Sequence, residues 1–218
     1  MNFSHLFEFL SELQENNSKE WMDTHRKRYQ LLRTSFIQWL DDLEQQLIAI
    51  DPDYHPTSGR KGINRINNNL LFHPNKPVYK DHFAAGLDQK TKQGDFYIQI
   101  GIHESILAGG YWKPDRNVLM SIREAIDYNG EELINIINKP SFQKTFGGLI
   151  PDKEMLKKAP KGYTMDHQYI DLLRHRTFAV IHPLTNTEIL HDNFTEKIIR
   201  VYKEMLPFRR YLNKAVTV

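Results

Sequence analysis

Hydrophobic residues near the N-terminus recur at helical spacing. Over residues 5–14 they fall on one face, and over residues 21–47 they recur every three or four positions, which is typical of an amphipathic α-helix. The pattern predicts a short helix capped by Ser4 and a second helix of about 30 residues capped by Ser18. Asp51-Pro52 should end the second helix, because the residue before a proline disfavours helical geometry.

The middle of the chain changes to a period of two. Residues 95–103 alternate isoleucine and phenylalanine with more polar residues, which predicts a half-buried strand. Residues 82–88 and 105–112 flank it as two further candidate strands, the latter broken by Gly109-Gly110. Their short connections favour antiparallel pairing, because parallel crossovers need a dozen or more residues.

The C-terminal half is expected to be mainly helical. A helix begins at Pro114, another segment over 167–175 looks helical, and a final helix starts near Asp192 or Asn193 with a kink at Pro207. Residues 176–182 are apolar on both faces and predict a strand in the sheet interior. The order of elements predicts an α+β fold, in which a mostly antiparallel sheet packs with long N- and C-terminal helices.

Length and composition favour one domain. The chain has 218 residues, 40% of them hydrophobic, and contains no cysteine, so disulfides, thiolate zinc sites and cysteine nucleophiles are excluded. We find no linker and predict a single domain over residues 1–218. The net charge of +2 is far from the strong positive bias of nucleic-acid binders, which makes a nucleic-acid partner unlikely on sequence grounds.

The sequence also argues against several other partners. No apolar run approaches the ~20 residues of a membrane helix, and the N-terminus does not resemble a signal peptide. We therefore expect a cytoplasmic protein with no membrane partner. Glycine-rich phosphate-binding motifs of the Rossmann and P-loop kinds are missing from the sequence, and we predict no cofactor.

Residues 51–81 differ from the rest of the chain. They hold several prolines, two glycines and three consecutive asparagines, with little apolar periodicity. A short strand over residues 63–66 is the one regular element that the pattern suggests. Long loops of this kind are uncommon in compact domains unless they are functional or mobile.

Part of this segment resembles a known family. The run from Arg65 to Lys80, RINNNLLFHPNKPVYK, is similar to the central motif of the uncharacterised bacterial and fungal domain-of-unknown-function 2461 family. Ordered matches elsewhere extend the resemblance over nearly the whole chain; they include Phe9-Leu-x-x-Leu13, Gly109-Gly110-Tyr-Trp112-x-Pro114, Phe146-Gly-Gly-Leu149 and Pro160-Lys-Gly-Tyr163. The resemblance implies a fold and candidate positions, but no reaction.

The chain departs from that family pattern at several charges. Family members usually carry Arg-Asp where Asn68-Asn69 stand and Arg-Phe-Ser where Leu71-Phe72-His73 stand. They also carry Lys-Asp-Lys where Pro74-Asn75-Lys76 stand. If those charges serve a chemistry, this chain is a variant branch or has lost it.

The motif supplies the first set of candidate ligand-binding residues. Arginine offers a bidentate fork, lysine a point charge and asparagine both donors and acceptors, which together suit a phosphate or carboxylate. The alternative is a solvated loop whose asparagines serve turns. The candidates are Arg65, Asn67, Asn69, Lys76, Tyr79 and Lys80.

Four further candidates lie outside the loop. His103 stands beside Glu104 as a possible acid–base pair, or as a strand end in water. Arg123 either reaches a pocket or forms a surface ion pair with Asp127. Lys161 and His167 belong to a basic turn that binds an anion at a helix N-terminus, or that is surface structure capped by Asp166.

Neither a metal site nor a nucleophile can be recognised. The ten histidines show no H-x-x-x-H or H-E-x-x-H spacing, so we predict no metal, and the catalytic residues are unknown. The sequence favours binding of, or catalysis on, a small anionic ligand in a polar pocket formed by the 60–80 loop. The alternative is a protein-interaction or weak nucleic-acid-binding module without catalysis, and enzyme status stays open.

Overall fold

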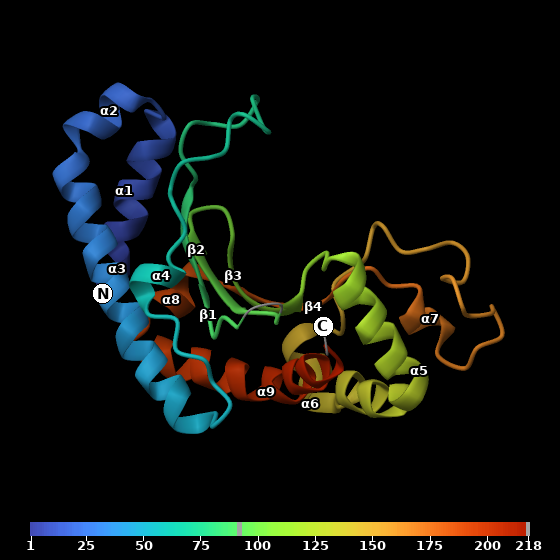
Figure 1. Ribbon diagram of the computed structural model, residues 1–218. Helices are drawn as coiled ribbons and strands as arrows, with labels where there is room; N and C mark the ends of the chain where they lie inside the picture. Colours follow the sequence, from blue (N-terminus) through green and yellow to red (C-terminus); the bar gives the residue numbers. More distant parts are fainter. Residues whose placement is uncertain (91–92, 217–218) are drawn as a thin grey trace. The chain divides into compact units, whose positions relative to one another are not determined.

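The computed structural model describes residues 1–90 and 93–216. Its contacts divide the chain into two compact units. Figure 1 colours the chain by residue number from the N-terminus to the C-terminus. The first unit comprises residues 1–89, 97–107 and 183–199, and the second comprises residues 90–96, 108–182 and 200–218. The prediction of a single domain over 1–218 stays a prediction, and each unit is described by itself below.

The described residues form one four-stranded antiparallel sheet with the order β1-β2-β3-β4. The predicted strands are confirmed, and no bound shifts by more than two residues. They are β1 (His82–Leu87), β2 (Phe96–Gly101), β3 (Ser105–Tyr111) and β4 (Phe178–Leu184). Together with the long helices at both ends of the chain, this sheet confirms the α+β class.

In the first unit, the long helix α3 packs against β1. The helices of this unit are α1 (Phe3–Glu15), α2 (Lys19–Thr24), α3 (Arg26–Ile50), α4 (Gly59–Gly62) and α8 (Asn186–Ile189). Phe36 of α3 meets Phe83 of β1 edge-on at 5.5 Å between ring centroids. Tyr29 contacts the same phenylalanine at 6.0 Å, so aromatic packing fixes the long N-terminal helix to the first strand.

The expected 30-residue N-terminal helix is interrupted at His25. Three donors converge on the carbonyl of Trp21: the backbone N–H of His25, the hydroxyl of Thr24 and the Nδ1 of His25. The His25 ring also stacks on the Trp21 ring at 3.9 Å. These contacts end α2 at a C-cap residue, and α3 starts immediately afterwards.

The N-caps were predicted with mixed success. Ser18 caps α2 as expected, its hydroxyl accepting from the backbone N–H of Trp21 at 3.2 Å. The first helix is instead capped by Asn2, which accepts from the N–H of His5. Ser4 was the wrong choice because the helix begins one residue before it, at Phe3.

The second unit contains the remaining helices. They are α5 (Arg116–Asn138), α6 (Pro140–Phe146), α7 (Ile170–Leu173) and, from residue 200 onward, α9 (Phe194–Ala215). Helix α5 is capped by Asp115 and has non-helical geometry at Asn129. The helix expected over 167–175 shrinks to the four residues of α7, with Tyr169 rather than Asp166 at its N-cap.

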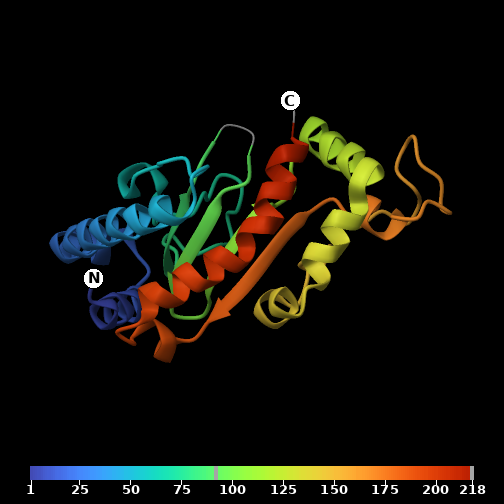
Figure 2. The same ribbon diagram turned by 90° about the horizontal axis from the view of Figure 1, so that it is seen from below.

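Gly109-Gly110 lies inside β3 and does not form the expected break. A Cβ at Gly109 would collide with the sulfur of Met205, and one at Gly110 would collide with the carbonyl of Phe178. Gly110 also has a φ of +103°, which disfavours other residues. Figure 2 shows α9 passing beside the strands of this unit, and the two glycines permit that close approach.

The first part of the 51–81 segment is ordered by one buried carboxylate. Glu44 of α3 is 3% exposed. Its oxygens accept from the hydroxyl of Tyr54 at 2.9 Å, the N–H of Thr57 at 2.8 Å and the N–H of Ser58 at 2.9 Å. Helix α4 follows directly, so this half of the segment is not the structureless loop that its composition suggests.

Replacing Glu44 by alanine should therefore destabilise the first unit. Loss of the carboxylate leaves buried donors unpaired, and we expect the free energy of unfolding to fall by about 3 kcal/mol. Glu44→Gln, which keeps one acceptor oxygen, should lose less. Gln45→Ala, at the exposed neighbouring position, should stay within about 0.5 kcal/mol of wild type in urea unfolding. Equal stability of Glu44→Ala and wild type would contradict this assignment.

Candidate functional site

The family-like motif folds into a two-stranded ribbon, residues 63–68 and 78–81, whose second segment continues into β1. Two antiparallel bridges join Ile63 to Ala85 and Asn67 to Tyr79. Between them, the N–H of Lys80 donates to the Ile66 carbonyl at 2.8 Å. The expected strand over 63–66 does not form as a regular strand: of these four residues only Ile63 forms a bridge, an isolated one to Ala85 of β1. Residues 69–77 form the loop at the end of the ribbon.

An asparagine side chain holds the other edge of the ribbon. In the bridge to Asn67, the N–H and carbonyl of Tyr79 face away from residue 67, as in a non-hydrogen-bonded antiparallel pair. Asn17 Oδ1 accepts from that N–H at 2.8 Å, and Asn17 Nδ2 donates to the carbonyl at 3.0 Å. Tyr79 is 4% exposed, so this candidate is a buried anchor of the ribbon.

Three candidate cations gather on the ribbon. Lys80 Nζ donates to the Arg65 carbonyl at 2.7 Å. Burial lowers the pKa of the Lys80 ammonium, and the charges of Arg65 and Lys76 lower it further. Within residues 1–90 and 93–216, none of the three pairs with a carboxylate at ion-pair distance. Asn67 and Asn69 are exposed on the same ribbon.

His103 lies in the turn after β2 and contacts Asp81 rather than Glu104. Its Nδ1 is 2.8 Å from Asp81 Oδ2, and the Nδ1 of His82 is 2.7 Å from Asp81 Oδ1. Glu104 instead contacts Gln99. Burial acts to raise the pKa of Asp81, but the hydrogen bonds from His82 and His103 outweigh it, and the net shift is downward.

This arrangement has the geometry of a histidine–carboxylate pair. An ionised carboxylate only accepts hydrogen bonds, so each Nδ1 carries the proton and each Nε2 is the remaining ring position. The His103 side chain is 73% exposed, and its Nε2 can exchange a proton with a molecule in solution. Sequence reasoning identified His103 but missed Asp81, because the two residues are 22 positions apart.

Arg123 and His167 join α5 to a neighbouring loop in the second unit. Arg123 donates to the carbonyls of Leu173 and His175 at 2.8 and 3.2 Å, instead of pairing with Asp127. Burial lowers the pKa of its guanidinium. Asp127 contacts His167 Nε2 at 2.9 Å, and His167 Nδ1 accepts from the N–H of Tyr169.

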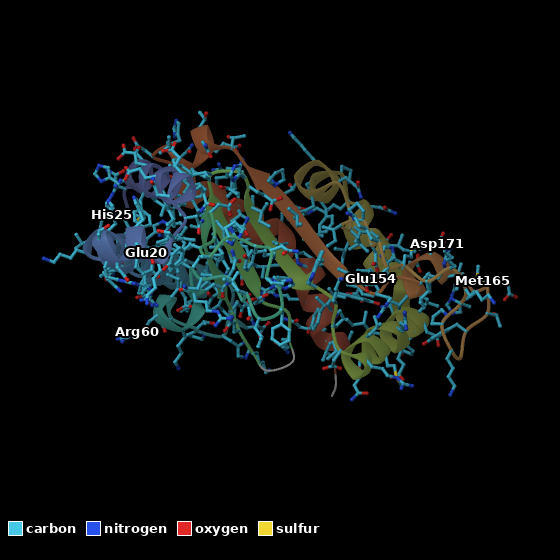
Figure 3. The ribbon with its side chains drawn as sticks, turned by 90° about the horizontal axis from the view of Figure 1, so that it is seen from above. Glu20, His25, Arg60, Glu154, Met165 and Asp171 are labelled. Atoms are coloured by element: carbon cyan, nitrogen blue, oxygen red, sulfur yellow. The ribbon has the colours of Figure 1, made fainter. Side chains whose placement is uncertain are left out.

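Lys161 is exposed on the loop between α6 and α7. Figure 3 labels Met165 farther along this loop and Asp171 on α7. Glu154, also labelled, pairs with Lys113 and Arg176. The structure therefore gives Arg123 and His167 definite hydrogen-bond partners within the second unit, while Lys161 faces solvent.

The second unit also contains a groove that sequence reasoning missed. It is an open groove with a volume of about 720 Å³ between the later part of α5 and the end of α9. The hydroxyl of Tyr211 donates to the Asn129 carbonyl at 3.1 Å. Burial, followed by the charges of Glu132 and Tyr169, raises the pKa of Tyr211 to about 12. None of the candidate residues named from the sequence lines this groove, and no sequence motif marks it.

Over the described ranges, no group of three or more histidine, aspartate or glutamate residues is placed to hold a metal ion. Among the helices of the described chain, none is both long and apolar enough to cross a membrane.

The fold defines an α+β protein, and the motif of the ribbon indicates its sequence family. The family model of conserved hypothetical proteins called DUF2461 matches residues 5–211. The chain belongs to this family, which confirms the resemblance seen in the sequence. Searches of curated proteins and of solved structures each gave no significant match.

The Asp81 pair should make stability depend on pH. Because the pKa of Asp81 is lowered on folding, its ionised form stabilises the fold above the ordinary carboxyl value of about 4. That contribution is lost as the pH falls through this value and then through the folded one. At neutral pH the free energy of unfolding of wild type should exceed that of Asp81→Asn by up to about 1 kcal/mol. The difference is no larger because solvent partly screens the interaction between Asp81 and the histidines.

Urea unfolding at neutral and strongly acidic pH tests this linkage. The difference between wild type and Asp81→Asn should vanish at the acidic end. Asp171→Asn is a control, because its side chain is 88% exposed and makes a single long ion pair. A difference that is constant with pH would show that ionisation of Asp81 does not stabilise the fold.

Arg123 should contribute to stability through its two backbone carbonyls. Hydrogen bonds from a charged donor contribute about 1.5–3 kcal/mol, and we expect Arg123→Ala to lower the free energy of unfolding by about 2 kcal/mol. Arg116→Ala, at an exposed position of the same helix, is the matched control. Hydrogen exchange should rise around residues 170–176 in Arg123→Ala alone, and unchanged exchange there would refute this role.

Proposed function

We propose that this protein binds a small anionic ligand on the ribbon formed by residues 63–68 and 78–81, together with the 69–77 loop at its end. The binding residues are Arg65, Lys76 and Lys80, with the exposed amides of Asn67 and Asn69 as additional donors. The observation that carries the proposal is the half-buried Lys80 ammonium. Its pKa is lowered by burial and by two neighbouring cations, and no described carboxylate pairs with it.

The electrostatics of the ribbon favour an anion. Like charges held near a partly desolvated ammonium destabilise its charged form. An anion placed between Arg65, Lys76 and Lys80 removes that repulsion and restores the pKa of the lysine. Arginine supplies a bidentate fork for a phosphate or carboxylate, and lysine supplies a compact charge.

Cations of the basic segments 25–29 and 208–211 provide a contrast to the ribbon. Arg26 pairs with Asp23, and Arg28 pairs with Glu12. Arg209 is 2% exposed and donates to the Gly94 carbonyl. These cations have protein partners, which argues against the alternative of nucleic-acid binding through those two segments.

Catalysis on the ligand would use the Asp81–His103 pair. Asp81 holds the Nδ1 proton of His103, which leaves Nε2 as the site of proton exchange. Binding is the first proposal, and a reaction requires that the bound anion present a group to this nitrogen. We also propose a cytoplasmic location, on the sequence grounds given above.

Inorganic pyrophosphate is a suitable probe of the anion site. Wild type should show a rise in Tm that increases with probe concentration, because a ligand at 100 times its Kd adds about 2.7 kcal/mol of stability. Lys80→Met and Arg65→Met should each reduce the rise and weaken binding in calorimetry. Binding should also weaken as salt is added, because salt screens exposed charges.

Lys203→Met is the matched control, since it removes an exposed lysine from α9 in the second unit. It should retain the full response to pyrophosphate. The proposal fails if wild type does not respond, or if Lys80→Met and Arg65→Met respond as wild type does.

A further inference from the structure

The loop at the end of the ribbon exposes three consecutive apolar side chains. Leu70, Leu71 and Phe72 are 37%, 84% and 72% exposed. Other large exposed hydrophobic residues of the described chain, such as Leu31 and Leu190, stand singly. Single exposed apolar residues are normal, whereas a contiguous patch marks an interaction surface.

The conformation of the loop maintains this exposure. The N–H groups of Phe72 and His73 donate to the Asn69 carbonyl at 3.3 and 3.0 Å, which closes a turn around the apolar residues. The Asn68 side chain donates to the Pro77 carbonyl at 2.9 Å and ties the two sides of the loop together. The apolar side chains therefore project from an ordered turn, at the end of the ribbon seen at the top of Figure 1.

Positive charge lies on the ribbon and loop that carry the apolar tip. Lys76 belongs to the same loop, and Arg65 and Lys80 stand on the two sides of the ribbon that carries it. The N–H of Lys76 donates to the His73 carbonyl at 3.1 Å, which ties this residue to the turn. An apolar end followed by cations is complementary to a lipid surface, where acyl chains lie beneath phosphate groups.

We propose that the 69–77 loop inserts into an anionic lipid surface. Leu70, Leu71 and Phe72 enter the boundary between headgroups and acyl chains, and the three cations contact headgroup phosphates. This inference rests on the proposed function, because the headgroup phosphate is the anion bound by the ribbon. The expectation of no membrane partner rested on the lack of a spanning segment, and a loop that inserts at the surface does not need one.

A lipid surface fits the loop better than a helical partner does. The three apolar residues are consecutive in sequence. A helix that binds in a groove of a partner protein instead uses apolar residues three or four positions apart. The nearby cations carry charge of one sign and have no carboxylate partner among the described residues. Such attachment is reversible, since few apolar groups enter the bilayer.

Vesicle co-sedimentation tests the inference. The whole protein should bind vesicles of phosphatidylcholine with added phosphatidylglycerol, bind pure phosphatidylcholine poorly, and dissociate as salt is raised. The double variant Leu71→Asp with Phe72→Asp should bind anionic vesicles at least about tenfold more weakly than wild type, because two charges now oppose insertion. Leu31→Asp, at a position 71% exposed on α3, should bind as wild type does.

Insertion itself can be observed at a single site. Because the chain contains no cysteine, Phe72→Cys carries one thiol for an environment-sensitive fluorophore. Its emission should shift to shorter wavelength with anionic vesicles, while the same label on Leu31→Cys should not shift. An unshifted label at residue 72 on bound vesicles overturns insertion.

The cation variants separate this inference from the proposed function. Lys80→Met and Arg65→Met should weaken both pyrophosphate and vesicle binding, by roughly fivefold per cation for vesicles. The double aspartate variant should lose vesicles but keep pyrophosphate. If wild type binds pyrophosphate and ignores anionic vesicles, or binds vesicles equally with both aspartates present, the lipid inference is wrong and the anion site stands. If neither probe binds, both proposals fail.

Discussion

The candidate site depends on one side-chain amide that takes the place of a neighbouring strand. Asn17 pairs with both backbone polar groups of Tyr79, while residues 66 and 68 pair with its chain neighbours on the other edge. Buried backbone groups need such partners, and with both edges satisfied Tyr79 can be buried. Lys80, the next residue, is then held with its ammonium against the Arg65 carbonyl. The cations owe their positions to backbone pairing and not to attraction among themselves.

What distinguishes this ribbon is that burial and two like charges act on the same ammonium, that of Lys80. Elsewhere some cations have partners, as Arg28 has Glu12 and Arg123 has two backbone carbonyls, and others, such as Lys161, are exposed to solvent. Lys80 has one carbonyl and two like charges, and its pKa falls accordingly. Charge near a partly desolvated group acts more strongly than charge in water. The pairing of each cation, more than the net charge of +2, therefore indicates where an anion is favoured.

The ribbon also explains how one segment can present two kinds of surface. Its paired segments position the cations, and its closed turn directs Leu71 and Phe72 outward. Functional groups on a loop are most useful when a rigid scaffold positions them. The buried carboxylate of Glu44 likewise positions the preceding segment. It accepts hydrogen bonds from Tyr54, Thr57 and Ser58 and so holds these residues against α3.

Local sequence patterns determined the class of fold, the strands of the sheet, the long helices and the Ser18 cap, while the family was recognised from ordered motifs. These features depend on residues a few positions apart, so the order of amino acids contains them. Only the tertiary structure decided that His25 interrupts the long helix, that Gly109-Gly110 admits α9, that His103 pairs with Asp81, and that Arg123 reaches carbonyls near residue 174. The interruption at His25 lies within local reach, but helical spacing gave no sign of its competing hydrogen bonds. The others join residues that are 22 to about 100 positions apart, and such contacts are set by how the chain folds back on itself, which no local pattern records.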